Sequence, residues 1–265
     1  MKSLYRISSL ILLICIFMLS ACSDNHVEEP IQTPEVIIEE PIETPEQIIE
    51  EAEEPEIIEE GVILHSGLRE DGSFDEGTLF IGDSLTVHLV SLYLEPNGYI
   101  GDAKYASKIG ASQVAYSSGL KMSVYDERCL FSEEFYGKTY PEAAAIMGES
   151  ASAIYVMLGT NISEYATKDS YIAMYKDLLT SCPNATVYAQ TIPYTTSIPY
   201  YKVNEIIISA YNELIESGEE RIVLLDSCTE IGENIIFDGV HMTDEGRENW
   251  YNGIVKFAKE NNIGQ

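Results

Sequence analysis

The chain has 265 residues and a formal net charge of −29, because 44 Asp and Glu residues outweigh 15 Lys and Arg residues. Contacts with nucleic-acid phosphates need Lys and Arg, so this composition argues against nucleic acid as a partner. The same charge argues against a protein that lies flat on anionic lipid.

Residues 1–22 have the pattern of an export signal. Lys2 and Arg6 precede an apolar run over residues 10–19, which is shorter than the roughly 20 residues that a membrane-spanning helix needs. The run ends in the letters LSAC, which resemble the lipobox of bacterial lipoproteins and place the lipidated cysteine at Cys22. We therefore expect an extracytoplasmic protein, lipid-anchored to the outer face of the bacterial cell membrane. The alternatives are an ordinary signal peptide cleaved just before Cys22, or a retained transmembrane helix.

Residues 23–60 differ in composition from the rest of the chain. They contain fourteen Glu and one Asp without Lys or Arg, and residues 28–38 (EEPIQTPEVII) are repeated as residues 39–49 (EEPIETPEQII). Short, self-repelling units broken by proline cannot bury a core, so this predicts a disordered acidic spacer. Nearly extended, it would reach on the order of 120 Å. There are two alternatives: the segment has no function of its own, or its Ile pairs dock on a partner.

Residues 61–265 alternate between strand-like and helix-like segments and form the predicted folded domain. Continuous apolar runs with β-branched or aromatic residues suit strands that are buried on both faces, and the alternation with helices is typical of a parallel sheet. We predict a three-layer α/β/α sandwich with a five-stranded parallel sheet. The expected strands are Thr78–Asp83, Lys104–Ile109, Ala153–Leu158, Thr186–Thr191 and Arg221–Asp226, and the expected helices are Leu85–Leu94, Pro141–Glu149, Lys168–Ser181, Pro199–Ser217 and Thr243–Asn261.

The domain contains three cysteines, Cys129, Cys182 and Cys228. At most one internal disulfide can form, and the spacings match no zinc pattern, so we expect neither a disulfide scaffold nor a metal or cofactor site. Cys182 precedes the fourth expected strand and Cys228 follows the fifth. Opposite ends of a sheet are too far apart for a bridge, so we predict no disulfide between these two, while a pair of Cys129 with Cys228 stays open.

A serine follows the first expected strand in the sequence Gly-Asp-Ser-Leu, with Ser84 as the serine. Ligands of open α/β sheets bind at the carboxyl ends of the strands. A serine between a buried strand and a helix lies at this edge, with its N–H directed from the start of the helix. Alone the tetrapeptide is a weak signal, because the serine could simply cap the helix.

Two candidate hydrogen-bond donors follow the next two strands. Gly110 comes after the second strand and Asn161 after the third. A glycine N–H and an amide side chain are neutral donors that suit an oxyanion hole, although each alone is more often part of a turn. Gly101 and Gly119 lie close in sequence and are the alternatives to Gly110.

An acid and a base stand together near the end of the chain, in Asp238-Gly-Val-His241. A serine hydroxyl needs a base to become a nucleophile, and an imidazole held by a carboxylate supplies one near neutral pH. The domain has two other histidines, His65 and His88. His65 precedes the sheet, and we expect His88, one helical turn after Ser84, to point away from the strand ends as an ordinary surface or half-buried side chain.

Together these motifs resemble the four sequence blocks of SGNH (GDSL) hydrolases, in the same order and over roughly residues 78–260. The resemblance implies that Ser84 is the nucleophile, that His241 is the general base and that Asp238 orients it. It also implies an oxyanion hole made by the Ser84 N–H, the Gly110 N–H and the Asn161 side chain. Many members have Asp after the third-block Asn, whereas Ile162 stands here, which blurs the subfamily.

A narrower resemblance points to cell-surface SGNH proteins that act on O-acetyl groups of wall polysaccharides or peptidoglycan. It rests on the Asp-Gly-Val-His block followed by a helix with Trp250. Tyr165 and Tyr194 follow strands on the same expected edge, where aromatic rings could bind sugar or acyl groups; packing of the loops is the alternative.

The sequence therefore predicts a serine esterase whose partner is an ester substrate, such as an acetylated glycan. An O-acetyltransferase with the same triad is the first alternative, because acceptor choice depends on water exclusion in the site. A non-catalytic binding lipoprotein on the same scaffold is the second. The acyl group, the alcohol and the oligomeric state are left open.

Overall fold

The computed structural model describes residues 61–123, 126–162, 166–233 and 236–263. The expected signal, Cys22, the acidic spacer and Tyr165 lie outside the described residues. Among the residues described, no helix combines the length and apolar character that crossing a bilayer requires.

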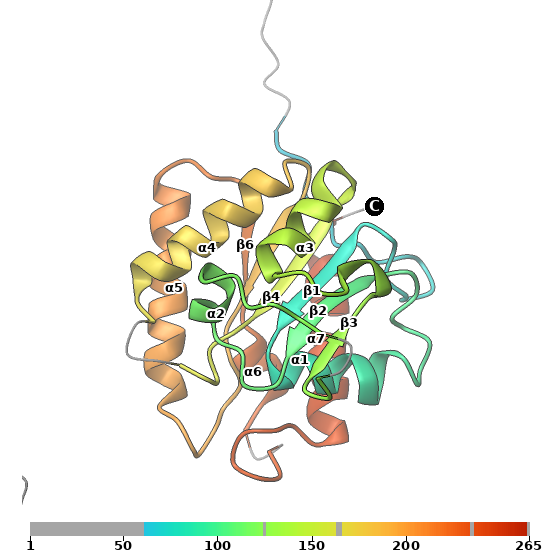
Figure 1. The fold of residues 1–265 in the computed structure, drawn as a ribbon, viewed down its shortest axis with the longest axis vertical. Helices are drawn as coiled ribbons and strands as arrows, with labels where there is room; N and C mark the ends of the chain where they lie inside the picture. Colours follow the sequence, from blue (N-terminus) through green and yellow to red (C-terminus); the bar gives the residue numbers. More distant parts are fainter. Residues whose placement is uncertain (1–60, 124–125, 163–165, 234–235, 264–265) are drawn as a thin grey trace, which may run out of the picture. The chain divides into compact units, whose positions relative to one another are not determined.

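Five parallel strands form the centre of the sheet, as predicted (Figure 1). They are β1 (Thr78–Gly82), β2 (Lys104–Lys108), β4 (Ala153–Met157), β5 (Thr186–Gln190) and β6 (Ile222–Leu225). Each lies within one residue of its expected bounds. β1, β4 and β5 are buried along their whole length, as suits strands of a parallel sheet, whereas β2 is only partly buried. In the described part of the chain the sheet order is β3-β2-β1-β4-β5-β6, so β1 lies beside both β2 and β4.

The sheet has a sixth strand that the sequence did not predict. β3 (Cys129–Phe131) pairs antiparallel with β2 at the edge of the sheet. The prediction of five strands was therefore one short, because a three-residue strand carries too little pattern to be recognised. Cys129, Cys182 and Cys228 are free thiols.

Helices cover both faces of the sheet (Figure 1). The predicted helices are observed as α1 (Ser84–Leu89) continued by the π-helical η1 (Val90–Leu94), α3 (Tyr140–Met147), α4 (Lys168–Ser181), α5 (Tyr200–Glu216) and α7 (Asp244–Glu260). Four short helices were not predicted: α2 (Gln113–Ser117), α6 (Ser227–Ile231) and the 3₁₀ turns η2 (Glu133–Phe135) and η3 (Gly148–Ser150). Together the layers form the expected α/β/α sandwich.

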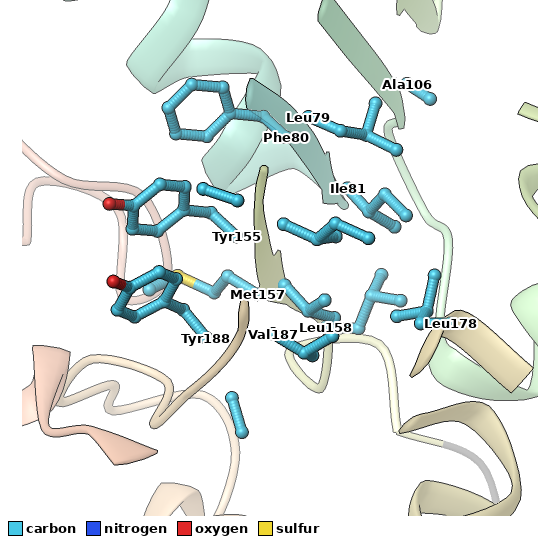
Figure 2. Packing of buried hydrophobic residues seen from close by; sticks show 14 of the residues in the cluster. Leu79, Phe80, Ile81, Ala106, Tyr155, Met157, Leu158, Leu178, Val187 and Tyr188 are labelled. Atoms are coloured by element: carbon cyan, nitrogen blue, oxygen red, sulfur yellow. The ribbon is translucent and has the colours of Figure 1, made fainter. Parts of the chain in front are cut away.

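The two faces of the sheet have different cores. Phe80, Tyr155 and Tyr188 are register partners on neighbouring strands, so their rings point to one face and stack at centroid distances of 5.2 and 4.5 Å (Figure 2). Phe257 of α7 packs edge-on against Tyr188. Aliphatic residues such as Leu79 and Ile81 fill the other face together with Leu178 of α4 (Figure 2). The stacked rings thus support α7, which directly follows the loop of His241.

Candidate active site

Ser84 is the first residue of α1, directly after the turn that ends β1. Its neighbour Asp83 caps the helix, since the Asp83 carboxylate accepts a hydrogen bond of 3.0 Å from the N–H of Leu85. Ser84 is 5% exposed and Gly82 is buried. A Cβ on Gly82 would lie 1.9 Å from Thr86 Oγ1 and 2.8 Å from the carbonyl oxygen of Met157, so the turn accepts only glycine there.

The buried carboxylate of Asp83 links the serine to the next strand along the sheet. It accepts hydrogen bonds from the N–H of Thr160 at 3.3 Å and from Thr160 Oγ1 at 2.5 Å. Burial raises the pKa of Asp83, while the bonds from Thr160 and Leu85 oppose that rise. Because Thr160 immediately precedes Asn161, this contact fixes the Ser84 turn against the Asn161 turn.

The structure brings Ser84, Asp238 and His241 together. His241 Nε2 lies 2.9 Å from Ser84 Oγ, and His241 Nδ1 lies 2.6 Å from Asp238 Oδ2. An imidazole whose Nδ1–H donates to the carboxylate leaves Nε2 free to accept the serine proton. The chain of contacts from carboxylate to imidazole to hydroxyl can therefore activate Ser84 as a nucleophile.

The carboxylate of Asp238 is held in its ionised form. Its Oδ1 accepts hydrogen bonds from the N–H groups of Val240 at 3.0 Å and of His241 at 2.7 Å. The backbone N–H of His241, followed by the bond to the imidazole, lowers the pKa of Asp238 to about 2. The side chain nevertheless stays 42% exposed, so solvent reaches the acid end of the triad.

The loop that carries the base is fixed by the loop that follows β5. The N–H groups of Thr196 and Ser197 donate to the carbonyl oxygen of Gly239 at 3.0 and 3.3 Å. Asn204 of α5 in turn accepts from the N–H of Ile192 and donates to its carbonyl oxygen, at 2.8 and 2.9 Å. The Asn204 side chain and the backbone bonds to Gly239 thus connect helix α5 to the loop of Asp238 and His241 through residues 192–197.

The predicted oxyanion donors lie on neighbouring turns. Gly110 is in the turn after β2, with a φ of +83° and with the N–H of Ala111 bonded to the carbonyl oxygen of Lys108 at 3.0 Å. Asn161 Nδ2 donates to the carbonyl oxygen of Ala111 at 3.1 Å and lies 3.3 Å from Thr160 Oγ1. The amide of Asn161 is therefore bound to the Gly110 turn, and these contacts must loosen or be shared if the amide is also to bind an oxyanion.

The two alternatives to Gly110 lie elsewhere. Gly101 precedes β2 and approaches the carbonyl oxygen of Phe74, and Gly119 follows α2 and lies beside Thr139. Only Gly110 of the three follows the carboxyl end of β2, next to β1.

Two aromatic side chains, His88 and Phe237, lie beside His241, and the sequence analysis did not assign either of them to the site. His88 lies 4.7 Å from His241 between ring centroids, and Phe237 lies 6.0 Å away with its plane at 27° to the imidazole. The expectation that His88 points away from the strand ends was wrong. Position i+4 of a helix shares a face with position i, so His88 lies on the same side of α1 as Ser84. Phe237 directly precedes Asp238 in the motif and is 63% exposed.

Tyr194 lies half-buried in the loop after β5, where its ring contacts Tyr200 at a centroid distance of 5.0 Å. Tyr200 packs edge-on against the exposed Tyr201.

A hollow of about 510 Å³ lies between residues 66–72 and the end of α7, and Ser84, Asp238 and His241 do not line it. In the described ranges, no group of three or more His, Cys, Asp or Glu side chains is arranged to hold a metal ion.

No family model and no curated protein matches this chain. Similar solved structures include a family 3 carbohydrate esterase from Clostridium thermocellum, 12% identical with a TM-score of 0.49, which covers 69% of this chain and 94% of that one. A member of the lipolytic protein G-D-S-L family from Veillonella parvula is 15% identical, with a TM-score of 0.45 over 68% of this chain and 96% of that one.

The C-terminal catalytic domain of peptidoglycan O-acetyltransferase A from Streptococcus pneumoniae is also similar. It is 14% identical, with a TM-score of 0.43, and the match covers 76% of this chain and 95% of that domain.

Proposed function

We propose that this chain is an extracytoplasmic serine esterase that hydrolyses small-acyl esters, with O-acetyl groups on carbohydrates as the substrate class. The observation that carries the proposal is the hydrogen-bonded series from Asp238 through His241 to Ser84, with contacts of 2.6 and 2.9 Å. Ser84 and His241 are 157 positions apart in the sequence, and they meet at the carboxyl end of strand β1.

In the first half of the reaction, Ser84 Oγ attacks the carbonyl carbon of the ester and His241 Nε2 takes the hydroxyl proton. Asp238 stabilises the imidazolium that forms, because its carboxylate stays ionised beside Nδ1. The tetrahedral intermediate collapses, the bond to the alcohol oxygen breaks, and the alcohol leaves with the proton from His241. An acyl group is then bonded to Ser84 Oγ.

In the second half, water gives a proton to His241 and attacks the acyl carbon; the bond from that carbon to Ser84 Oγ breaks, His241 returns the proton to Oγ, and the carboxylic acid leaves. The proposed oxyanion donors are the N–H groups of Ser84 and Gly110 and the amide of Asn161. Neutral donors at this position stabilise negative charge as it develops on the carbonyl oxygen.

The carbohydrate part of the proposal has its support in the aromatic side chains around the site. Phe237 presents a ring to solvent beside His241, and Tyr194, with the exposed Tyr201 nearby in sequence, belongs to the neighbouring loop region. The flat apolar face of an aromatic ring suits both sugar faces and short acyl groups, and a Tyr ring adds a hydroxyl for hydrogen bonding.

The cellular location is proposed from the sequence. An acyl chain on Cys22 and the acidic spacer would place the esterase outside the membrane and within reach of cell-wall glycans. Labelling with radioactive palmitate tests this anchor, which is wrong if a Cys22→Ala variant incorporates as much label as the parent.

Hydrolysis of p-nitrophenyl acetate by the purified chain tests the reaction. Ser84→Ala should lower kcat/KM by at least about 10³-fold, because the nucleophile is lost while binding remains. Ser91→Ala is the matched control, since Ser91 is half-buried just beyond α1 and its hydroxyl only donates to the carbonyl oxygen of Val87. Equal activity of the parent and Ser84→Ala would reject the nucleophile. Release of acetate from acetylated xylan then tests the substrate class, which fails if long-chain esters are cleaved and acetylated glycans are not.

A further inference from the structure

His88 lies where it can support the base of the proposed triad. Its imidazole is half-buried on α1, one turn after Ser84, and its ring centroid lies 4.7 Å from that of His241 with the planes inclined by 44°. His241 thereby contacts Ser84 and Asp238 through its two nitrogens and His88 through its ring. The three contacts together restrict both the position and the tilt of the base.

The surroundings of His88 favour its uncharged form. Its Nδ1 is buried and has no hydrogen-bond partner among the described residues. Burial, followed by the nearby His241 and Arg247, lowers the pKa of His88, and Asp238 opposes this shift. No further charged group of β1, β2 or η1, which also pack near α1, acts on it in the described part of the chain.

An uncharged ring suits this place for two physical reasons. A cation here would repel the imidazolium that His241 becomes during the reaction. A neutral ring in contact with His241 occupies space beside it, whereas a small side chain would leave a gap in which the base can move.

We propose that His88 is a positioning residue for His241, whose uncharged ring holds the base in line between Ser84 and Asp238. The proposal rests on the proposed esterase function and adds a fourth residue to its machinery. Displacement of a reacting group by about 1 Å can cost as much as 10²-fold in rate, so even a modest loss of support should be measurable.

The test compares His88→Ala with His88→Phe in the full-length protein, using p-nitrophenyl acetate from pH 5 to pH 9. We expect His88→Ala to lower kcat by about 10- to 100-fold with KM little changed, because the base is displaced while the substrate still binds. His88→Phe restores a ring of similar width and should recover most of kcat, with a pH profile of unchanged shape. His65→Ala is the matched control, since His65 is also half-buried but lies before the sheet.

A second measurement separates this proposal from the esterase proposal. The proton between His241 Nδ1 and Asp238 gives a far-downfield NMR signal, which should persist in the parent and in His88→Phe and be lost or broadened in His88→Ala. That pattern supports the positioning role even if the protein hydrolyses no ester tested. An unchanged signal and kcat in His88→Ala would overturn it, as would an altered acid limb in His88→Phe, since the latter means that His88 acts through its own proton.

Discussion

The nucleophile and the base of the proposed triad are held by different means. Ser84 and its neighbours Gly82 and Asp83 are buried, and their turn is packed between β1, β4 and α1. Asp238 and His241 lie in an outer loop, with side chains 42% and 25% exposed. The position of the nucleophile is therefore part of the core, whereas the position of the base depends on a few hydrogen bonds and ring contacts.

Because of this difference, we expect substitutions in the two regions to affect stability and activity in different proportions. An atom added to the Ser84 turn meets close-packed neighbours that cannot relax, so it should lower the melting temperature as it inactivates the protein. A change in the loop of the base can be absorbed by solvent and by neighbouring side chains. It should lower activity with a smaller loss of melting temperature than a change that overpacks the Ser84 turn.

Of the substitutions in the exposed loop, Asp238→Asn should have the largest effect on kcat/KM. The amide keeps Oδ1 for the N–H groups of Val240 and His241 but replaces the Oδ2 acceptor of His241 Nδ1 with a donor. Loss of the correct tautomer costs on the order of 10⁴-fold in other triads; because water reaches Asp238, we expect roughly 10³-fold in kcat/KM. The melting temperature should change by no more than about 2–4 °C.

Asp71→Asn is the matched control for that variant. Asp71 also accepts from the N–H two residues ahead, that of Ser73, at 2.9 Å, but it lies in a loop before β1. Activity should not change there. If Asp238→Asn kept its activity within tenfold, the carboxylate would not be the group that orients His241.

Gly82→Ala gives the opposite result, a loss of stability. The added Cβ would lie 2.6 Å from Thr86 Cβ and 2.8 Å from the carbonyl oxygen of Met157, and the latter belongs to the central strand β4. Overpacking of this kind costs about 3 kcal/mol, which lowers the Tm of a domain of this size by about 6–12 °C. Gly61→Ala, where nothing lies within 4 Å of the new Cβ, is the control. Calorimetry that finds no change in Gly82→Ala would show that the turn is not close-packed.

The sequence predicted the buried part of the molecule better than the exposed part. Four of the five parallel strands, β1, β4, β5 and β6, are largely apolar runs, whereas β2 (KYASK) contains two Lys and one Ser. Four motifs after successive elements then placed Ser84, Gly110, Asn161 and the Asp238–His241 pair at one edge. Strand β3 escaped because three residues carry no period, and its pairing depends on contacts with β2 that are distant in sequence.

The wrong prediction for the orientation of His88 has a different cause. The sequence marks His88 as helical and one turn after Ser84, and helical geometry alone puts both residues on one face. What the sequence does not contain is that the loop of His241, 153 positions later, returns to cover that face. The ring pair could be found only once the tertiary structure joined the two segments. The same holds for the bonds from Thr196 and Ser197 to Gly239.

Gly239→Ala, in the loop of His241, has the smallest expected effect on activity of the variants compared. Gly239 has a φ of +91°, and an added Cβ would lie 2.6 Å from Ser197 Oγ and 2.9 Å from Thr196 Oγ1. Both hydroxyls are flexible ends that can rotate away, so the remaining cost is backbone strain of about 1–3 kcal/mol in an exposed loop. We expect kcat/KM to fall by about tenfold as His241 shifts, with a smaller loss of Tm than in Gly82→Ala.

The double variant Ser197→Ala, Gly239→Ala separates the two causes, because it removes the close contact with Oγ and keeps the strained φ. Recovery of activity in the double variant would assign the loss to the contact, and no recovery would assign it to the backbone. A Gly239→Ala protein that unfolds as readily as Gly82→Ala would contradict the comparison itself. It would mean that the loop of the base is as much a part of the core as the turn of the nucleophile.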